Sequence, residues 1–227
     1  MRFSLRLGDT LRSTVAAQVE SNSKGIAVMQ GLLHAKRVLV TGASRGIGFE
    51  ISKRFLSEGA EVLGVSRDEG RLTAAAERLG LQPPGHFHPL AVDLAAPGCA
   101  HPLVEWVTKR WGGLDLLVLN AAIMAKTPEG TGLAQEPPGT LERTLELNLL
   151  SPFRVATGLL PLLRASREPR VIFVSSGAGT KSGLREPGLA SYRLSKWALN
   201  GLVLLLSKEL EGQVNVSALD PGWVKTD

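Results

Sequence analysis

Short apolar runs alternate with amphipathic stretches along most of this chain, and this alternation constrains the fold more than any other feature. The apolar runs predict strands at Arg37–Thr41, Glu61–Ser66, Phe87–Val92, Leu114–Leu119, Val171–Val174 and Val214–Leu219. The stretches between them predict helices at Ile47–Glu58, Glu69–Leu79, Leu103–Trp111, Leu141–Leu163 and Ser191–Leu210. Strands and helices in strict turn imply right-handed crossovers. The pattern therefore predicts an α/β fold, with a doubly wound parallel sheet between two layers of helices.

Prolines and one aspartate refine these elements. Pro89 makes the third strand a weak one, because a proline cannot donate to the ladder. Pro152 and Pro161 are expected to bend or end the longest helix. Asp68 is expected to cap the helix that begins at Glu69.

Composition describes an ordinary globular protein. The chain of 227 residues fits one domain, with 44% hydrophobic and 21% charged residues. No apolar run approaches the ~18 residues of a membrane span. The single cysteine, Cys99, excludes an internal disulfide and fits a reducing compartment. Cys99 and His101 would supply only two ligands, so we expect a loop cysteine and no metal site.

The positive charge is concentrated at the start of the chain. Residues 1–37 hold six Lys and Arg against two acidic residues, whereas the whole chain carries a net charge of +5. The body is thus nearly neutral, and nucleic acid is not an expected partner. Residues 1–35 are interpreted as a basic, disordered leader, with Met29 as an alternative start. They also faintly resemble a transit peptide, so a mitochondrial location stays open beside the expected cytoplasmic one.

A glycine-rich loop joins the first strand to the first helix. It reads Thr41-Gly-Ala-Ser-Arg-Gly-Ile-Gly48, and its glycines allow a tight turn and a close approach of a diphosphate. The helix N-terminus then offers free N–H groups and a favourable dipole to the anion. The spacing differs from G-x-G-x-x-G, and no Lys-Ser/Thr follows as in a P-loop. An ordinary strand–helix turn is the alternative interpretation.

The only tyrosine, Tyr192, precedes Lys196 by four residues on a predicted helix. This step places both side chains on one face, one turn apart. A neighbouring ammonium favours the phenolate and so lowers the pKa of the phenol. A phenol tuned in this way can act as a general acid or base. The pair alone is weak evidence, because it also arises by chance on helices.

The glycine loop, Tyr192 and Lys196 together resemble the short-chain dehydrogenase/reductase family, from about residue 36 to the end. The resemblance implies a Rossmann-type domain at residues 36–227 that transfers hydride between a nicotinamide and a carbonyl or alcohol carbon. Two segments look most like carbonyl-reductase-type members, which suggests ketone, aldehyde or quinone substrates. These segments are the Tyr192–Lys196 block and the ending Pro221–Asp227.

Further segments match the family in order. Asn120-Ala121-Ala122 resembles its Asn-Ala-Gly, although Ala122 replaces the glycine and Leu119 the usual preceding asparagine. Asn148 matches the asparagine that bends its helix and holds a water of the proton relay. Ser176 aligns with the catalytic serine but lies 16 residues before Tyr192, which is longer than usual, so Ser175 is the fallback.

The resemblance also implies roles. Ser176 would hydrogen-bond the substrate carbonyl and Tyr192 would donate the proton. Lys196 would lower the pKa of Tyr192 and bind the ribose, and Asn148 completes the catalytic set. The residues implied to contact the cofactor are Gly42, Ser44, Arg45, Gly46, Ile47, Gly48, Ser66, Arg67, Asp93, Leu94, Asn120, Ala121, Tyr192, Lys196, Pro221, Gly222, Val224 and Thr226.

The end of the second strand indicates the cofactor. NAD enzymes carry a carboxylate there, and NADP enzymes carry positive charge for the 2′-phosphate. Ser66 and Arg67 stand at this position, and Arg45 lies in the glycine loop. Two guanidinium groups can hydrogen-bond a phosphate, whereas Asp68 lies one residue beyond the position at which NAD enzymes carry their carboxylate. We therefore expect NADP(H).

The chain stops at Asp227, before the seventh strand and the lid that the resemblance implies. We expect a bare edge at Val214–Leu219, weak NADPH binding and poor turnover by this chain. A homodimer or homotetramer through Leu141–Leu163 and Ser191–Leu210 is expected, with burial of the latter helix against its own sheet as the alternative. The alternative function is a non-catalytic NADP(H)-binding regulatory or truncated form.

Overall fold

The computed structural model describes residues 31–80, 84–125, 128 and 130–224. The predicted leader up to residue 30, and Thr226 among the predicted site residues, lie outside them. Residues 31–35, which the prediction placed in the leader, form a turn bonded to the end of the first helix. Leu33 N donates to the Glu58 carbonyl at 3.2 Å, and Ala35 N donates to the Gly59 carbonyl at 3.0 Å. The compact unit begins at Gly31.

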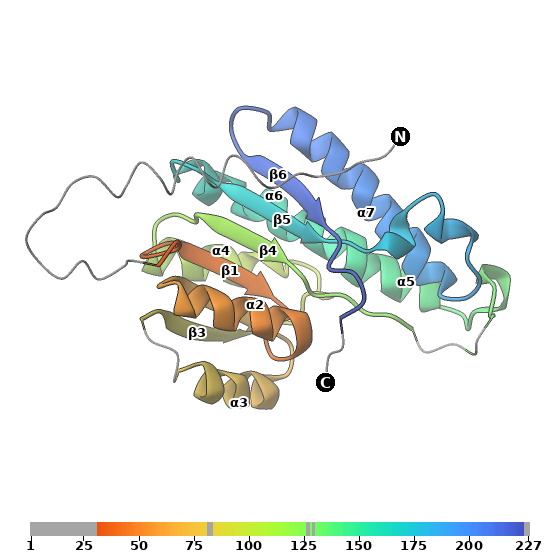
Figure 1. The fold of residues 1–227 in the computed structure, drawn as a ribbon, viewed down its shortest axis with the longest axis horizontal. Coiled ribbons are helices and arrows are strands. Elements are labelled where there is room, and N and C mark those ends of the chain that lie inside the picture. Colours follow the sequence, from red (N-terminus) through yellow and green to blue (C-terminus); the bar gives the residue numbers. More distant parts are fainter. Residues whose placement is uncertain (1–30, 81–83, 126–127, 129, 225–227) are drawn as a thin grey trace, which may run out of the picture. The chain divides into compact units, whose positions relative to one another are not determined.

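The described strands form one parallel sheet (Figure 1). They are β1 (Arg37–Thr41), β2 (Glu61–Ser66), β3 (His86–Ala91), β4 (Leu116–Leu119), β5 (Arg170–Val174) and β6 (Asn215–Leu219). Their order is β3-β2-β1-β4-β5-β6, and every pair is parallel. The predicted doubly wound α/β fold is confirmed. Pro89 lies on β3, opposite Gly64 of β2, at an edge of the described sheet where a proline is tolerated.

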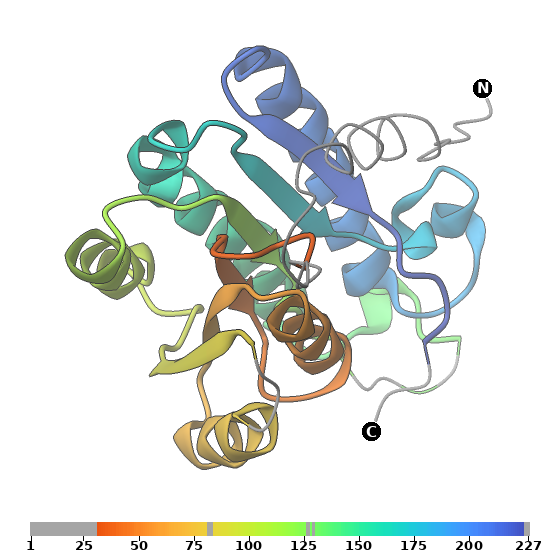
Figure 2. The same ribbon diagram turned by 60° about the vertical axis from the view of Figure 1, so that its left-hand side comes forward.

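Helices cover both faces of this sheet (Figures 1 and 2). They are α2 (Gly46–Ser57), α3 (Glu69–Leu79), α4 (Ala100–Arg110), α5 (Thr140–Leu145), α6 (Ser151–Arg164) and α7 (Ala190–Glu209). The helices α2 and α3 pack on one face, and α4, α6 and α7 pack on the other. Asp68 caps α3 as predicted, because its carboxylate accepts from Arg71 N at 2.9 Å.

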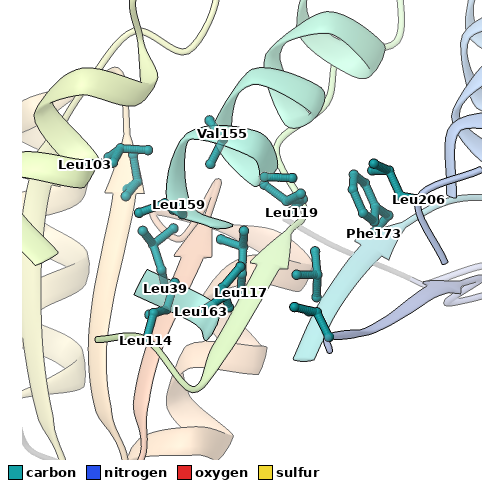
Figure 3. Packing of buried hydrophobic residues seen from close by; sticks show 14 of the residues in the cluster. Leu39, Leu103, Leu114, Leu117, Leu119, Val155, Leu159, Leu163, Phe173 and Leu206 are labelled. Carbon is teal, nitrogen blue, oxygen red and sulfur yellow. The ribbon is translucent and has the colours of Figure 1, made fainter. Parts of the chain in front are cut away.

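Leucine, valine and phenylalanine side chains fill the space between the sheet and the second helix layer (Figure 3). Leu39 and Leu117 of the central strands, Leu159 of α6 and Phe173 of β5 are fully buried. Burial of each such side chain contributes about 1.5–3 kcal/mol. This packing holds the strands in register and brings their carboxyl ends to one edge.

The predicted helix Leu141–Leu163 is divided in the structure. Its first part is α5, a π-helical segment follows at Glu146–Leu150, and α6 begins at Ser151. Pro152 lies in the first turn of α6, where its missing N–H costs no hydrogen bond, and Pro161 lies inside α6. The interruption coincides with Asn148, whose side chain bonds the main chain of Ile123.

An ion pair fastens the opposite end of the sheet. The Arg37 guanidinium donates to both carboxylate oxygens of Asp115, at 2.9 and 3.0 Å, and the Ser166 hydroxyl donates to the same carboxylate at 2.6 Å. Burial opposes ionisation of Asp115, but the hydrogen bonds from Arg37 and Ser166 outweigh it and lower its pKa to about 2. The pair therefore links the start of β1 to the segment before β4 down to acidic pH.

Three further features of the described ranges concern the cysteine, membrane spans and metal ligands. Cys99 is a free cysteine whose side chain is buried in the core beside α4. No helix within residues 31–80, 84–125 and 130–224 is long and apolar enough to cross a membrane. In the same ranges, no group of three His, Cys, Asp or Glu side chains could hold a metal ion.

Candidate active site

The candidate site lies at the carboxyl ends of the strands, where the sheet order reverses between β1 and β4. The glycine loop follows β1, Asn120 follows β4, Ser175 and Ser176 follow β5, and Asp220 follows β6. In open parallel sheets this edge, at this switch point, is where ligands bind. Residues that are far apart in the sequence therefore share one location.

Glycines shape the turn between β1 and α2. Gly42 and Gly46 have φ of +70° and +57°, a conformation that glycine adopts without strain. A Cβ on Gly48 would lie 2.3 Å from the Gly42 carbonyl oxygen and 2.6 Å from Asn120 Nδ2, so no side chain fits there. The helix α2 begins without a capping side chain and without an acid in its first turn. Its N-terminus therefore suits an anion.

Thr41 joins the ends of the two central strands. Its hydroxyl accepts hydrogen bonds from the backbone N–H of Asn120, at 2.9 Å, and of Ala121, at 3.0 Å. The Asn120 amide donates to the Thr41 carbonyl at 3.0 Å. Asn120 and Ala121 are thus fixed beside the glycine loop. Sequence reasoning missed the part played by Thr41, for which its position at the strand end was the only signal.

The residues expected at the adenosine end of the cofactor gather at the end of β2. The hydroxyls of Ser44 and Ser66 lie 3.0 Å apart, and Arg45 and Arg67 are exposed. The Asp68 carboxylate is engaged with Arg71 through the helix cap and an ion pair of 3.2 Å.

Asp93 and Leu94 follow β3 on the same edge of the sheet. Asp93 is exposed, and its carboxylate accepts from Ala95 N at 3.0 Å. Leu94 is buried in the core. The structure therefore leaves Asp93 accessible to a ligand, whereas Leu94 would contribute its backbone.

Tyr192 and Lys196 lie near the start of α7, with the Lys196 ammonium 5.7 Å from the centre of the Tyr192 ring. Lys196 is only 3% exposed and donates to the carbonyl of Val174, the last residue of β5, at 2.7 Å. The Ser176 side chain lies close enough to the Tyr192 hydroxyl to lower its pKa. By contrast, the Ser175 hydroxyl donates to Asn200 at 2.6 Å. The structure therefore brings Ser176, and not the fallback Ser175, to Tyr192.

Asn148 is connected to Tyr192 through a serine. Its buried amide accepts from Ile123 N and donates to the Ile123 carbonyl, both at 2.8 Å, and it donates to the Ser195 hydroxyl at 3.0 Å. The Ser195 hydroxyl in turn donates to the Tyr192 carbonyl at 2.7 Å. Ser195 was not predicted, although it directly precedes Lys196.

The segment after β6 supplies the remaining candidates. Gly222 has a φ of +68°, and its N–H donates to the Asp220 carboxylate at 3.0 Å. Pro221 precedes this turn, and Val224 is exposed at 48%. Asp220 was not predicted as a site residue, but its charge acts on Tyr192.

A family model described as short chain dehydrogenase matches residues 36–227. The chain belongs to the short-chain dehydrogenase/reductase family. The prediction of an NAD(P)-dependent oxidoreductase of this family is thereby confirmed. The finer assignment to carbonyl-reductase-like members stays a prediction.

Curated relatives and solved structures agree with this membership. The chain is 30% identical to (+)-neomenthol dehydrogenase of Arabidopsis thaliana, over 83% of each chain. It is 36% identical to the rhamnolipids biosynthesis 3-oxoacyl-[acyl-carrier-protein] reductase of Pseudomonas aeruginosa, over 84% of this chain and 73% of the relative. A solved Pseudomonas aeruginosa RhlG/NADP complex superposes with a TM-score of 0.75 at 35% identity, covering 86% of this chain and 75% of the other.

Electrostatics in this short-chain dehydrogenase differ from the expectation for Tyr192. Burial raises the pKa of Tyr192 above its ordinary value, the nearby Ser176 hydroxyl opposes this, and the Asp220 charge adds to it. Burial lowers the pKa of Lys196 to about 8. The predicted lowering of the Tyr192 pKa is thus not found in this structure, because desolvation of the phenol is the largest influence on it.

Replacement of Lys196 by Met tests this burial. The folded pKa of Lys196 lies below its unfolded value, so the cation destabilises the folded state below pH 8, and stability is recovered as pH rises from about 8 towards 10.5. We expect the stability gained by Lys196→Met to be about 1 kcal/mol smaller at pH 9 than at pH 7. Urea unfolding at the two pH values measures it.

Lys208→Met is the matched control, because Lys208 lies on the same helix with its side chain 82% exposed. Its effect on stability should be the same at both pH values. A pH-independent difference between Lys196→Met and the parent protein would show that Lys196 is not desolvated in the folded state.

Proposed function

We propose that this protein is an NADPH-dependent oxidoreductase that transfers hydride between the nicotinamide and a ketone or aldehyde, or the matching alcohol. One observation carries the proposal: Ser176, Tyr192 and Lys196 converge beside a glycine loop that leads into an uncapped helix N-terminus. A phenol, a hydroxyl donor and a buried ammonium at one point are the groups needed to stabilise a developing alkoxide.

The described residues fit a dinucleotide. At Gly48 the backbone of Gly42 and the Asn120 amide leave no room for a Cβ, which permits close contact between main chain and phosphate. The N-terminus of α2 would hold the diphosphate, and the other predicted contact residues that the structure describes follow along the same edge of the sheet. When bound, the nicotinamide supplies or accepts the hydride.

Side chains of this protein would transfer the proton to the substrate oxygen. Ser176 would orient the substrate oxygen through a hydrogen bond, and Tyr192 would donate its phenolic proton to that oxygen. The raised pKa keeps Tyr192 protonated at neutral pH, which favours its action as an acid in the reducing direction. The Lys196 ammonium would stabilise the phenolate that remains.

Proton resupply would use the buried polar path behind Tyr192. Asn148 lies 3.0 Å from the Ser195 hydroxyl, which bonds the Tyr192 carbonyl. These groups would position a water that returns a proton to the phenol. The named relatives support the substrate class, since one is a reductase of a 3-oxoacyl group and the other a dehydrogenase of neomenthol.

Surface residues suggest a homodimer. Trp197, Leu204 and Leu205 are exposed on one stripe of α7, at 44%, 68% and 71%, and Phe153 is exposed at 40% on α6. Burial of such side chains against a second copy would remove them from water. Light scattering should therefore give twice the mass of the chain, and Leu204→Glu should shift it towards monomer. A monomer for the unchanged protein would contradict this.

A cytoplasmic location stays a prediction from the sequence.

Cofactor preference is the first test of the site. Arg45 and Arg67 are exposed at the end of β2, and no free carboxylate of the described residues competes with a 2′-phosphate there, since Asp68 is bound to Arg71. Solved relatives of Shigella flexneri and Escherichia coli contain NADP and NADPH. Fluorescence titration should show tighter binding of NADPH than of NADH.

Replacement of both arginines by alanine should weaken NADPH binding by at least about 10- to 100-fold, the range expected for the loss of a single charged hydrogen bond, and should leave NADH binding unchanged. Arg164→Ala, an exposed arginine at the end of α6 and away from the site, is the control for loss of positive charge. A preference for NADH above tenfold would overturn the assignment of NADP(H).

Replacement of Tyr192 by Phe separates the enzyme from a non-catalytic cofactor-binding protein. The variant loses only the phenolic hydroxyl, so we expect kcat/KM for carbonyl reduction to fall by about 100- to 10,000-fold while the Kd for NADPH is kept. Full activity in the variant would refute the role of Tyr192. Cofactor binding without any turnover in the parent protein would favour the non-catalytic alternative.

A further inference from the structure

The helix that carries Tyr192 begins in an unusual way. Its N-cap residue is Leu189, with φ of +55° and ψ of +34° and no capping hydrogen bond from its own side chain. A leucine side chain cannot accept a hydrogen bond, and the left-handed conformation costs a non-glycine residue about 1–2 kcal/mol. Tyr192 stands in the first turn of this helix, where helices fray most readily. Something else must hold this turn in place.

Glu136 supplies the missing cap from a distant loop. Its Oε1 accepts from the Ser191 backbone N–H at 3.1 Å, and its Oε2 accepts from the Ser191 hydroxyl. Glu136 lies 55 residues earlier, between β4 and α5, and Ser191 is only 1% exposed. A carboxylate at a helix N-terminus is favoured by the dipole, and its hydrogen bonds are of the stronger, charge-assisted kind.

The residue on the other side of Tyr192 is anchored as well. The Arg193 guanidinium donates to the carbonyls of Gly183 and Gly188, both at 2.7 Å, and of Pro187 at 3.2 Å. Arg193 thus fixes the loop that leads from Ser176 to α7. Two charged side chains therefore hold the neighbours of Tyr192 on both sides: Arg193 anchors the loop before α7, and Glu136 reaches the helix from the β4–α5 loop.

We propose that Glu136 is a positioning residue that fixes the first turn of α7 and so aims the Tyr192 phenol at Ser176. This inference rests on the proposed function for its kinetic consequence, but the positioning itself is a property of the fold. Loss of the cap would let the first turn fray and the phenol swing away from Ser176. The glycine loop joins β1 to α2 and makes no contact with Glu136, so cofactor affinity would be kept.

The chain has a single tyrosine, which allows a direct test. Protein labelled with [¹³Cζ]tyrosine gives one NMR signal, from Tyr192. We expect one sharp signal in the parent protein and a shifted or broadened one in Glu136→Ala. Glu136→Gln keeps the acceptor for the Ser191 N–H and should restore most of the parent signal. Glu142→Ala, an exposed glutamate on α5, is the matched control and should change nothing.

Kinetics provide the second readout. Glu136→Ala should lower kcat by about 10- to 100-fold, the loss expected from a misplacement of about 1 Å, with the KM for NADPH unchanged. An unmoved Tyr192 signal in Glu136→Ala would overturn the proposal, as would a lowered melting temperature with unchanged kcat. A parent protein without turnover would refute the proposed function alone, because the NMR signal reports positioning independently of activity.

Discussion

The close approach of main chain at the centre of the sheet is the constraint on which this structure depends. Gly48, the Gly42 carbonyl and the Asn120 amide are packed so tightly that a single Cβ would collide. The Thr41 hydroxyl holds the first residues after β4 against the end of β1. Next to this close contact between the glycine loop and the residues after β4, the N-terminus of α2 stays uncapped at the switch point of the sheet. An uncapped helix N-terminus at this point is the physical requirement for a phosphate site.

Burial is the main influence on the pKa values of Tyr192 and Lys196. Lys196 is nearly inaccessible, and desolvation lowers its pKa, while the same effect raises the pKa of the nearby Tyr192. Both shifts make ionisation less favourable than in water, although a pKa of about 8 still leaves Lys196 charged at neutral pH. Addition of anionic phosphate and loss of the Tyr192 proton would each favour the Lys196 cation. A bound anionic ligand can therefore raise the lowered pKa of Lys196.

The elements could be predicted because each depends on local pattern. Buried parallel strands appear as short apolar runs, and the Asp68 cap is a contact three residues along the chain. The division of the long helix at Asn148 was only partly foreseen, since the hydrogen bonds to Ile123 that accompany it come from another element. The glycine loop and the Tyr192–Lys196 step were visible because their spacing is itself the signal.

The missed features depend on tertiary contacts. Glu136 and Ser191 meet across 55 residues, and nothing near either residue marks the pair. The sign of the Tyr192 pKa shift depends on how deeply the ring is buried and on Asp220, which follows a different strand. A four-residue step places a cation near a phenol, but it cannot weigh that cation against desolvation. Local spacing therefore identifies the groups, and three-dimensional packing sets their properties.

The central claim is that the glycine loop, held against the residues after β4, forms a phosphate site that faces Tyr192. A crystal structure with bound NADP⁺ tests this claim most directly. The diphosphate should accept hydrogen bonds from the first N–H groups of α2, and the nicotinamide should lie beside the Tyr192 and Ser176 hydroxyls. A cofactor bound away from the Gly42–Gly48 loop, or a Tyr192 phenol turned away from the nicotinamide, would contradict it.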